Sequence, residues 1–449
     1  MGSKMAKIET VSDAIDYIHG RHKWTKTPTF ERLNKILARL GHPEQQLKYV
    51  HVTGTNGKGS TSKMIAQLLR ASGLKVGLFT SPYILKFNER IQDDRGNIKD
   101  ADLLDLVKRL APIVEQLDVE LPTGLTEFET LTVLMFMYFT EHPVDVVVLE
   151  VGVGGTWDST TVIPDKIAAV ITTVGLDHMH VLGHTITEIA TQKAGIIQRQ
   201  RPLIVGRLPK DANQVLNTVA NAMGAPIYRL GQQFQATSLA AGDEWGERFQ
   251  VTGSINYQNL FVDLIGKYQI DNAAVAIQTS QIVAKYFKHS LTAAMIDSAL
   301  ETVTWPVRFE KVATNPEVVL DGAHNEPGVR ALVETLRTRF SKRRVHVLFG
   351  ALSDKNYPKM LQLLTELPNV VLHVVGFQGP NNRQPINPSE VLEQTAMADL
   401  KMHKNWQQGY QTVRAGIQPD DLILFTGSLY FVSEVRQAFA TANENVGGH

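Results

Sequence analysis

Three glycines and a lysine stand close together in the segment 51–61, "HVTGTNGKGST". Gly54, Gly57 and Gly59 let the backbone turn so that successive N–H groups converge on one point, and Lys58 adds a positive charge beside them. An apolar run precedes this loop, and a segment with helical periodicity follows it. A strand, a glycine loop and a helix N-terminus together bind phosphate. The pattern therefore predicts a P-loop for a nucleoside triphosphate, although a glycine cluster taken alone would indicate an ordinary turn.

This loop departs from the common pattern G-x-x-x-x-G-K-[ST]. Val52 stands where the first glycine of that pattern would be, and Gly59 separates Lys58 from Ser60. We therefore interpret the loop as a P-loop variant. We expect the hydroxyl of Ser60 to reach a magnesium ion on the bound phosphates.

Candidate metal ligands lie in two other segments. Glu150 ends the valine-rich run 144–149, and a carboxylate at the carboxyl edge of a buried strand beside a P-loop is where a magnesium ligand is expected. The alternative for Glu150 is a solvated acid at a strand end. His178, His180 and His184 are close enough in sequence to suggest zinc. We expect His180 and His184 to be ordinary loop histidines instead.

Lys193 lies on the apolar face of a predicted helix. Thr185 and Glu188 form a capping-box pattern, and three apolar residues precede Lys193 at helical spacing. Burying an ammonium without a partner costs several kcal/mol, so its pKa should fall and the neutral amine, which can react with carbon dioxide, should become accessible. The alternative is a lysine whose ammonium extends to solvent from a partly buried helix.

The elements that must position these residues follow an α/β rhythm. From Tyr49 to Val205, short β-branched runs alternate with amphipathic segments, which predicts a mostly parallel sheet with crossover helices. The expected strands are residues 49–52, 76–79, 144–149, 167–174 and 203–205. Short alternating runs between 226 and 266 predict a small antiparallel insertion, and helices are expected at 270–286 and around 291–303.

A domain boundary is expected at Trp305-Pro306, where proline interrupts the local structure. The rhythm restarts after it, with strands expected at residues 318–320, 345–349, 370–375 and 422–425. We therefore predict the α/β fold class with two domains. Residues 1–305 form an ATP-binding P-loop domain, and residues 306–449 form a smaller Rossmann-like α/β domain.

Composition excludes several classes of function. Two domains suit a chain of 449 residues, and 45 basic against 45 acidic residues give no global field for nucleic acid or an anionic membrane. There is no cysteine, which excludes disulfides, thiolate metal sites and cysteine nucleophiles. The N-terminus is polar, and the longest apolar run, 131–139, falls far short of the ~20 residues that span a bilayer. We expect a cytoplasmic monomer whose partners are small molecules.

The order of motifs resembles the folylpolyglutamate synthase and dihydrofolate synthase family, relatives of the Mur peptide ligases of cell-wall synthesis. The resemblance rests on "HVTGTNGKGS" and, in order, on "SPYILKFNERI", "LTEFETLT", "VVVLEVGVGG", "LDHMHVLGHTITEIATQKAGI", "YQIDNAAVAI", "LDGAHNEPG" and "FTGSLY". The segment "GVGGTWDSTT" departs from the family wording, which tends to have Asn where Thr161 stands and often Arg near Thr156.

Together, the residues and the resemblance imply a set of site residues. The implied magnesium ligands are Ser60, Ser81, Glu150, His178 and Lys193, the last as a carbamate. The implied ATP-binding residues are Gly54, Thr55, Asn56, Gly57, Lys58, Gly59, Ser60, Asn272, Arg308 and Asp321, and the implied catalytic residues are Lys58, Lys193, His324 and Ser428. The resemblance also makes the loop 81–91 part of a folate cleft, with Tyr83 and Phe128 as candidates to flank a flat ring. Asp354, Lys355 and Arg383 match less closely and could be ordinary surface charges.

The resemblance implies ATP-dependent addition of L-glutamate to the glutamyl tail of folate through an acyl phosphate. The expected cofactors are ATP and Mg²⁺ at two sites, and the expected substrates are folate, glutamate and ATP. Three alternatives stay open: a dihydrofolate synthase or an enzyme with both activities, a Mur-type cell-wall ligase, and a nucleotide-dependent switch. We prefer folylpolyglutamate synthesis because no clear dihydropteroate-binding signature stands near the N-terminus.

Overall fold

The computed structural model describes residues 8–22, 29–240, 242, 244–379, 383–395 and 400–446. The chain forms two compact units. Unit 1 comprises residues 1–237, 249–260 and 271–303, and unit 2 comprises residues 238–248, 261–270 and 304–449. Two short earlier segments thus belong with the C-terminal part of the chain, and the division into domains 1–305 and 306–449 stays a proposal.

Unit 1 contains an eight-stranded sheet of order β4-β3-β2-β5-β1-β6-β7-β8. Its strands are β1 Tyr49–Thr53, β2 Val76–Phe79, β3 Ile91–Asp93, β4 Gly96–Asn97, β5 Val146–Glu150, β6 Ala168–Ile171, β7 Leu203–Val205 and β8 Ile227–Arg229. The six strands from β2 to β8 in this order are parallel, and β3 and β4 add antiparallel at one edge. Strand β1 lies at the centre between β5 and β6, so the carboxyl ends of these three strands meet at one edge of the sheet.

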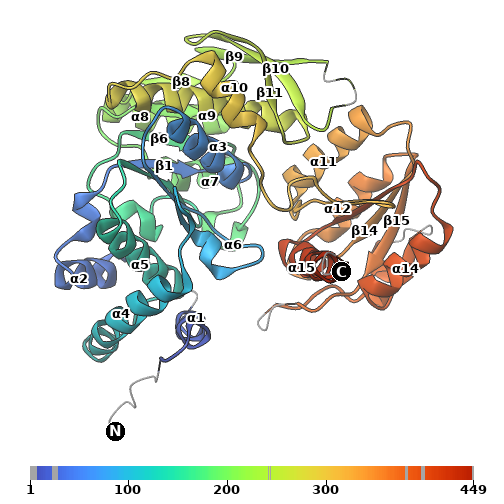
Figure 1. The fold of residues 1–449 in the computed structure, drawn as a ribbon, viewed down its shortest axis with the longest axis horizontal. Coiled ribbons are helices and arrows are strands. Elements are labelled where there is room, and N and C mark those ends of the chain that lie inside the picture. Colours follow the sequence, from blue (N-terminus) through green and yellow to red (C-terminus); the bar gives the residue numbers. More distant parts are fainter. Residues whose placement is uncertain are drawn as a thin grey trace. The chain divides into compact units, whose positions relative to one another are not determined.

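Helices cover both faces of this sheet (Figure 1). They are α1 Val11–His19, α2 Glu31–Arg39, α3 Lys58–Ala71, α4 Asp100–Glu120, α5 Glu127–Glu141, α6 Met179–Leu182, α7 Ile186–Ala194, α8 Lys210–Met223, α9 Lys267–Tyr286 and α10 Ala293–Glu301, with 3₁₀ helices η1 Pro43–Gln46, η2 Phe87–Arg90 and η3 Ser159–Val162. Helices α1, α2, α4 and α5 share one core with β1, β2 and β5, in which Phe79 and Phe136 are fully buried. Helices α7 and α8 share a second core with β6 and β7.

A small sheet of order β11-β10-β9 follows, with β9 Phe234–Leu239, β10 Glu247–Gly253 and β11 Tyr257–Val262. The connections between these strands are too short for a parallel crossover, so neighbouring strands run antiparallel, as predicted. The predicted start of this insertion is wrong by one strand. Strand β8 lies within the predicted insertion, but it pairs parallel with β7 in the large sheet.

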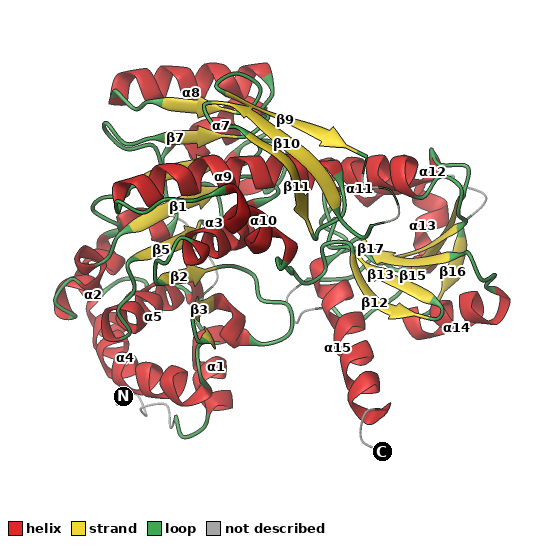
Figure 2. Cartoon of the chain, turned by 45° about the horizontal axis from the view of Figure 1, so that its top comes forward, coloured by secondary structure: helices red, strands yellow, loops and turns green. Residues whose placement is uncertain are grey.

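Unit 2 contains a six-stranded sheet of order β12-β13-β17-β14-β15-β16, visible on the right of Figure 2. Its strands are β12 Glu310–Thr314, β13 Glu317–Leu320, β14 Val345–Phe349, β15 Val370–Val375, β16 Lys401–His403 and β17 Leu422–Thr426. Its helices are α11 Glu326–Arg339, α12 Tyr357–Thr365, α13 Pro388–Thr395, α14 Trp406–Gly416 and α15 Leu429–Val446. Only the edge strand β12 is antiparallel, so the predicted second α/β fold is confirmed.

The predicted loop 81–91 is only partly irregular. The 3₁₀ helix η2 and the first residue of β3 lie within it. The carboxylate of Glu89 accepts hydrogen bonds from the N–H groups of Ile84, Leu85 and Lys86, which folds the loop onto its own backbone. Among the helices that the structure describes, none is long and apolar enough to cross a membrane.

A row of buried histidines crosses the edge of the unit 2 sheet. Nδ1 of His346 on β14 lies 3.4 Å from Nε2 of His373 on β15, and Nδ1 of His373 lies 3.0 Å from Nε2 of His403 on β16. At one end, Nε2 of His346 lies 3.3 Å from a carboxylate oxygen of Asp421. Burial lowers the pKa of all three histidines, that of His373 to about 3. The rings are therefore neutral near neutral pH.

Acidification should destabilise the chain through His373. Its folded pKa of about 3 lies below the value of about 6.5 for an unfolded chain, so the unfolded state binds more protons between these values and stability falls as pH falls. On acidification, positive charge on His403 and His346 would act in the same direction, as does the charge of Lys401. As the pH falls from about 7 to about 5, His373 should lower the free energy of unfolding by about 2 kcal/mol.

Thermal unfolding of the wild type and of His373→Phe at both pH values measures this effect. The variant should lose less of its Tm on acidification than the wild type, whatever its Tm at neutral pH. Exposed His180, replaced by Gln, serves as the control. An equal loss of Tm in wild type and His373→Phe would contradict the prediction.

Candidate active site

The P-loop joins β1 to α3 in unit 1. Gly57 caps the helix with φ +83°, and the first helical bond runs from the N–H of Thr61 to the carbonyl of Gly57 at 2.9 Å. The N–H groups of Lys58, Gly59 and Ser60 therefore have no carbonyl partner within the helix and point out of its N-terminus. The ammonium of Lys58 donates to the carbonyl of Gly54 at 3.0 Å. Three amides and one positive charge gather at this end of α3, which suits a phosphate.

Asn272 of α9 lies against the P-loop. A Cβ atom on Gly57 would lie 2.5 Å from Oδ1 of Asn272, and its positive φ is one that L side chains rarely adopt. Only glycine fits this position. The predicted ATP-binding residues Gly57 and Asn272 are thus adjacent, although they stand far apart in the sequence.

The N–H groups of Thr55 and Asn56 are already paired within the protein. That of Thr55 donates to the carbonyl of Thr173 at 2.9 Å, and that of Asn56 donates to the Thr173 hydroxyl at 2.8 Å. The hydroxyl of Thr172 donates to the carbonyl of Asn56 at 2.6 Å. Two of the successive amides that we expected to converge on one point are therefore bound to the segment after β6 instead, and the assignment of Thr55 and Asn56 to ATP stays a prediction.

Glu150 and Ser60 provide oxygen ligands at the same edge of the sheet. Glu150 ends β5 beside β1, is 3% exposed, and accepts the N–H of Ser81 at 3.1 Å, so the predicted ligands Glu150 and Ser81 are in contact. Ser60 lies in the first turn of α3 and is 2% exposed. A hydroxyl and a carboxylate beside a phosphate site fit Mg²⁺, which takes few protein ligands and completes its shell with phosphate oxygens and water.

Lys193 is buried, as its position on the apolar helix face predicts. It is 2% exposed, near the end of α7, whose capping box at Thr185 is present as predicted. Burial lowers its pKa well below the ordinary value, and the charge of Lys58 lowers it further, against the opposing effect of Asp177 and Asp158. Lys193 thus lies within electrostatic range of the P-loop lysine. A neutral amine in this position is suited to carbamate formation.

The three histidines after β6 occupy different environments. His178 precedes α6 with φ +49°, is partly exposed, and its Nε2 lies 4.0 Å from a carboxylate oxygen of Asp177. His180 and His184 are exposed. Within the described ranges, no three His, Asp or Glu side chains group closely enough to hold a metal ion by themselves. A P-loop magnesium site needs no such group, and the role of His178 stays a prediction.

In unit 2, Asp321 holds together the loops that carry its neighbours. This residue follows β13, and its buried carboxylate accepts the N–H groups of Phe309 at 3.1 Å and Ala323 at 3.0 Å. Burial raises its pKa, against the opposing charge of Arg308. The guanidinium of Arg308 lies close to the same loop, since a Cβ atom on Gly322 would lie 2.4 Å from its Nη1. Arg308 and Asp321 are therefore brought together.

His324 and Ser428 lie in two loops that are bonded to each other. Nδ1 of His324 lies 2.8 Å from the carbonyl of Gly322, and the N–H of Gly427 donates to the carbonyl of Ala323 at 3.0 Å. Ser428 is 3% exposed and directly precedes α15. These predicted residues therefore gather at the carboxyl ends of the adjacent strands β13 and β17. Their catalytic roles stay predictions.

The aromatic candidates Tyr83 and Phe128 pack against the core of unit 1. The ring centroids of Phe128 and Phe79 lie 5.9 Å apart, and those of Tyr83 and Phe87 lie 5.7 Å apart. Both are only partly buried. Arg383 and Asp354 form an ion pair at 2.7 Å with both side chains substantially exposed, which favours their interpretation as surface charges.

Several residues that support this site were not predicted from the sequence. Thr172 and Thr173 bind the P-loop, while Asp158, Thr160 and Lys166 form a buried polar group beside β1. Hydroxyl residues that follow a buried strand are a weak signal that could have pointed to Thr172 and Thr173. No local pattern marks Lys166.

Comparison with known proteins shows matches to two family models, two curated relatives and one solved structure. The Mur ligase middle domain matches residues 52–280, and the Mur ligase glutamate ligase domain matches residues 307–429. The chain is 40% identical to the folylpolyglutamate synthase of Lacticaseibacillus casei, over 95% of this chain and 98% of that protein. It is 38% identical to the dihydrofolate synthase/folylpolyglutamate synthase of Bacillus subtilis, over 95% and 98% respectively. It also resembles a solved FPGS–AMPPCP–folate complex with a TM-score of 0.84 and 38% identity, over 96% of this chain and 99% of that one.

Proposed function

Because this chain belongs to the folylpolyglutamate synthase and dihydrofolate synthase family of the Mur ligase superfamily, we propose a reaction in which each of its clustered residues has a role. The chain catalyses the ATP-dependent ligation of L-glutamate to the glutamyl tail of folate. It uses ATP together with Mg²⁺.

The chemistry follows from the substrates. A carboxylate is a poor electrophile, so the terminal carboxylate of the folate tail first takes the γ-phosphoryl group of ATP. A P–O bond to the carboxylate forms, the P–O bond to ADP breaks, and an acyl phosphate results. The α-amine of glutamate then attacks the acyl carbon. The C–N bond forms, the amine loses a proton, and phosphate leaves.

The residues of unit 1 account for the first step. The amides of Lys58, Gly59 and Ser60 fix the phosphates, and the ammonium of Lys58 stabilises the charge on the transferred phosphoryl group. When bound, Mg²⁺ would neutralise phosphate charge, held by Ser60 and Glu150 with Ser81, His178 and carbamylated Lys193 as further proposed ligands.

We assign Asn272 and Arg308 to ATP, Asp321 to holding the loop beside Arg308, and His324 and Ser428 to the phosphoryl group or glutamate.

A single observation supports this assignment most strongly. Lys193 is fully buried, yet it lies within electrostatic range of Lys58 at a phosphate-binding helix end. Burial beside Lys58 favours the neutral amine of Lys193, which can take up carbon dioxide, and the carbamate would then offer an anionic oxygen to Mg²⁺ on the phosphates. A nucleotide-dependent switch gives no reason for a buried lysine so near the phosphate site. We further propose that the chain acts as a cytoplasmic monomer on small molecules, without nucleic acid or membrane partners.

Glutamate incorporation with three acceptors tests the function. The enzyme is given labelled glutamate, ATP and Mg²⁺ with tetrahydrofolate, dihydropteroate or a UDP-linked muropeptide. Label should enter tetrahydrofolate products. Labelling of dihydropteroate as well would show both activities, as the name of the Bacillus subtilis relative indicates for that protein. Labelling of the muropeptide alone would contradict the proposal.

A further inference from the structure

We propose that a buried row of four side chains, Lys166, His51, Thr160 and Asp158, positions the P-loop, Glu150 and Lys193 relative to one another. We call these four residues the relay. Lys166, His51 and Thr160 are then positioning residues for the ligase reaction. The inference rests on the proposed function, because it assumes that the three positioned groups share one magnesium and nucleotide site.

The contacts of the relay are continuous. The ammonium of Lys166 lies 3.0 Å from Nδ1 of His51, and Nε2 of His51 lies 2.8 Å from the hydroxyl of Thr160. That hydroxyl donates to a carboxylate oxygen of Asp158 at 2.5 Å. The exposed fractions of Lys166, His51, Thr160 and Asp158 are 4%, 0%, 0% and 6%. The relay is thus shielded from water over its whole length.

The relay has one direction. When Lys166 is protonated, its ammonium only donates, so Nδ1 of His51 accepts from it and the ring proton is on Nε2. This proton is donated to Thr160, whose own hydroxyl hydrogen is donated to Asp158. The loss of either middle member, His51 or Thr160, interrupts the row and leaves a buried polar group without its partner. Each link therefore depends on the others.

Its members are attached to the segments that carry the proposed site. His51 lies in β1, three residues before Gly54 of the P-loop. The second carboxylate oxygen of Asp158 accepts the N–H of Val153 at 2.9 Å, in the loop that follows Glu150. The ammonium of Lys166 also donates to the carbonyl of Ile196 at 2.9 Å, just beyond the helix that bears Lys193. One chain of side chains thus connects all three segments.

Stability alone does not explain a charged group here. Burial lowers the pKa of Lys166 to about 7, which shows that the ammonium is costly to hold inside the protein. Apolar side chains of similar volume in place of a buried charge pair are often neutral or stabilising. Directional hydrogen bonds fix the distances between backbone segments, which apolar packing specifies less well.

Two substitutions at Thr160 test the relay. Thr160→Val removes the hydroxyl and keeps the shape, whereas Thr160→Ser keeps the hydroxyl. Thr279→Val is the matched control, because Thr279 is equally buried and its hydroxyl donates to the carbonyl of Val275 at 2.7 Å, outside the relay. Lys166→Met removes the opposite end of the relay. Each variant is titrated with AMPPCP and Mg²⁺ by calorimetry, and kcat, KM and Tm are measured beside it.

Thr160→Val and Lys166→Met should both raise the Kd of AMPPCP with Mg²⁺ and lower kcat by about 10- to 100-fold at temperatures below their Tm. Thr160→Ser and Thr279→Val should stay within about twofold of the wild type. Equal losses in Thr160→Val and Thr160→Ser, or an unchanged Lys166→Met, would overturn the proposal. If the wild type binds AMPPCP but adds no glutamate to folate, the proposed function fails. The Kd values of the variants relative to the wild type still test the positioning role of the relay.

Discussion

Replacing Lys58 by Ala should lower kcat for glutamate addition to tetrahydrofolate by about 10²- to 10³-fold, because a preorganised cation at the transferred phosphoryl group is lost. The ammonium already lies at the helix N-terminus, held by the carbonyl of Gly54 at 3.0 Å, so it needs little reorganisation to reach a phosphate. Phosphate release under saturating ATP, folate and glutamate measures the effect.

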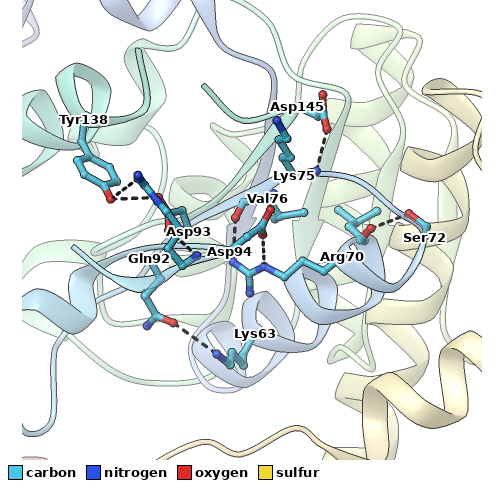
Figure 3. Close-up of polar contacts among 12 residues, drawn as sticks. Lys63, Arg70, Ser72, Lys75, Val76, Gln92, Asp93, Asp94, Tyr138 and Asp145 are labelled. Atoms are coloured by element: carbon cyan, nitrogen blue, oxygen red, sulfur yellow. Dashed lines mark hydrogen bonds and ion pairs between the residues drawn. The ribbon is translucent and has the colours of Figure 1, made fainter. Parts of the chain in front are cut away.

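Lys63 provides the matched control for Lys58. It stands on the same helix, but Figure 3 shows it directed toward Gln92, whose amide oxygen lies 3.4 Å from its ammonium. Burial lowers the pKa of Lys63 to about 8, so it is also a partly buried lysine. Lys63→Ala should retain activity within about tenfold of the wild type. Near wild-type turnover in Lys58→Ala, or equal losses in both variants, would remove Lys58 from the proposed mechanism.

The second large effect is expected at Lys193. Lys193→Met keeps the length and burial of the side chain but cannot form a carbamate, and it should lower kcat by about 10²-fold while folding is maintained. The substitution also removes a buried amine that is costly to ionise, so Tm should not fall. A fall in kcat with an unchanged or raised Tm separates a functional role from a structural one.

Carbon dioxide provides an independent test of the same residue. Wild-type enzyme depleted of carbon dioxide should lose activity and recover it on addition of bicarbonate, because a lysine whose pKa is lowered presents the neutral amine that carbamate formation needs. Lys193→Met should not respond to bicarbonate. A wild type indifferent to depletion, together with a full loss of activity in Lys193→Met, would assign Lys193 a role as an amine rather than as a carbamate.

The parts of the fold that could be predicted are those whose signal is local. Strands β7, β14 and β15 have the predicted bounds because mostly apolar runs of this kind are typical of strands buried in a parallel sheet. Short edge strands such as β4 Gly96–Asn97 and β16 Lys401–His403 contain few apolar residues, so the sequence gives no signal for them. Strand β8 shows a second limit, since its composition resembles the insertion and only its hydrogen bonds to β7 place it in the large sheet.

The candidate site divides in the same way. Gly57, Glu150 and Lys193 could be found because each stands at a recognisable place in one element: a loop, a strand end or a helix face. Thr173 and Lys166 could not, because their partners stand far away in the sequence. The contact from Thr173 to Asn56 spans 117 residues, and that from Lys166 to His51 spans 115. Such pairs are set by the packing of the sheet, which no local spacing encodes.

The contacts of the histidine row in unit 2 determine which nitrogen of each imidazole carries the hydrogen. A carboxylate only accepts, so Asp421 requires the hydrogen of His346 on Nε2, which leaves Nδ1 as an acceptor for the Nε2 hydrogen of His373. The same reasoning passes to His403 through the 3.0 Å contact. The carboxylate of Asp421 at the end of the row thus sets the tautomer of all three imidazoles. An amide at this position could also donate, so all three rings could carry the hydrogen on Nδ1 instead.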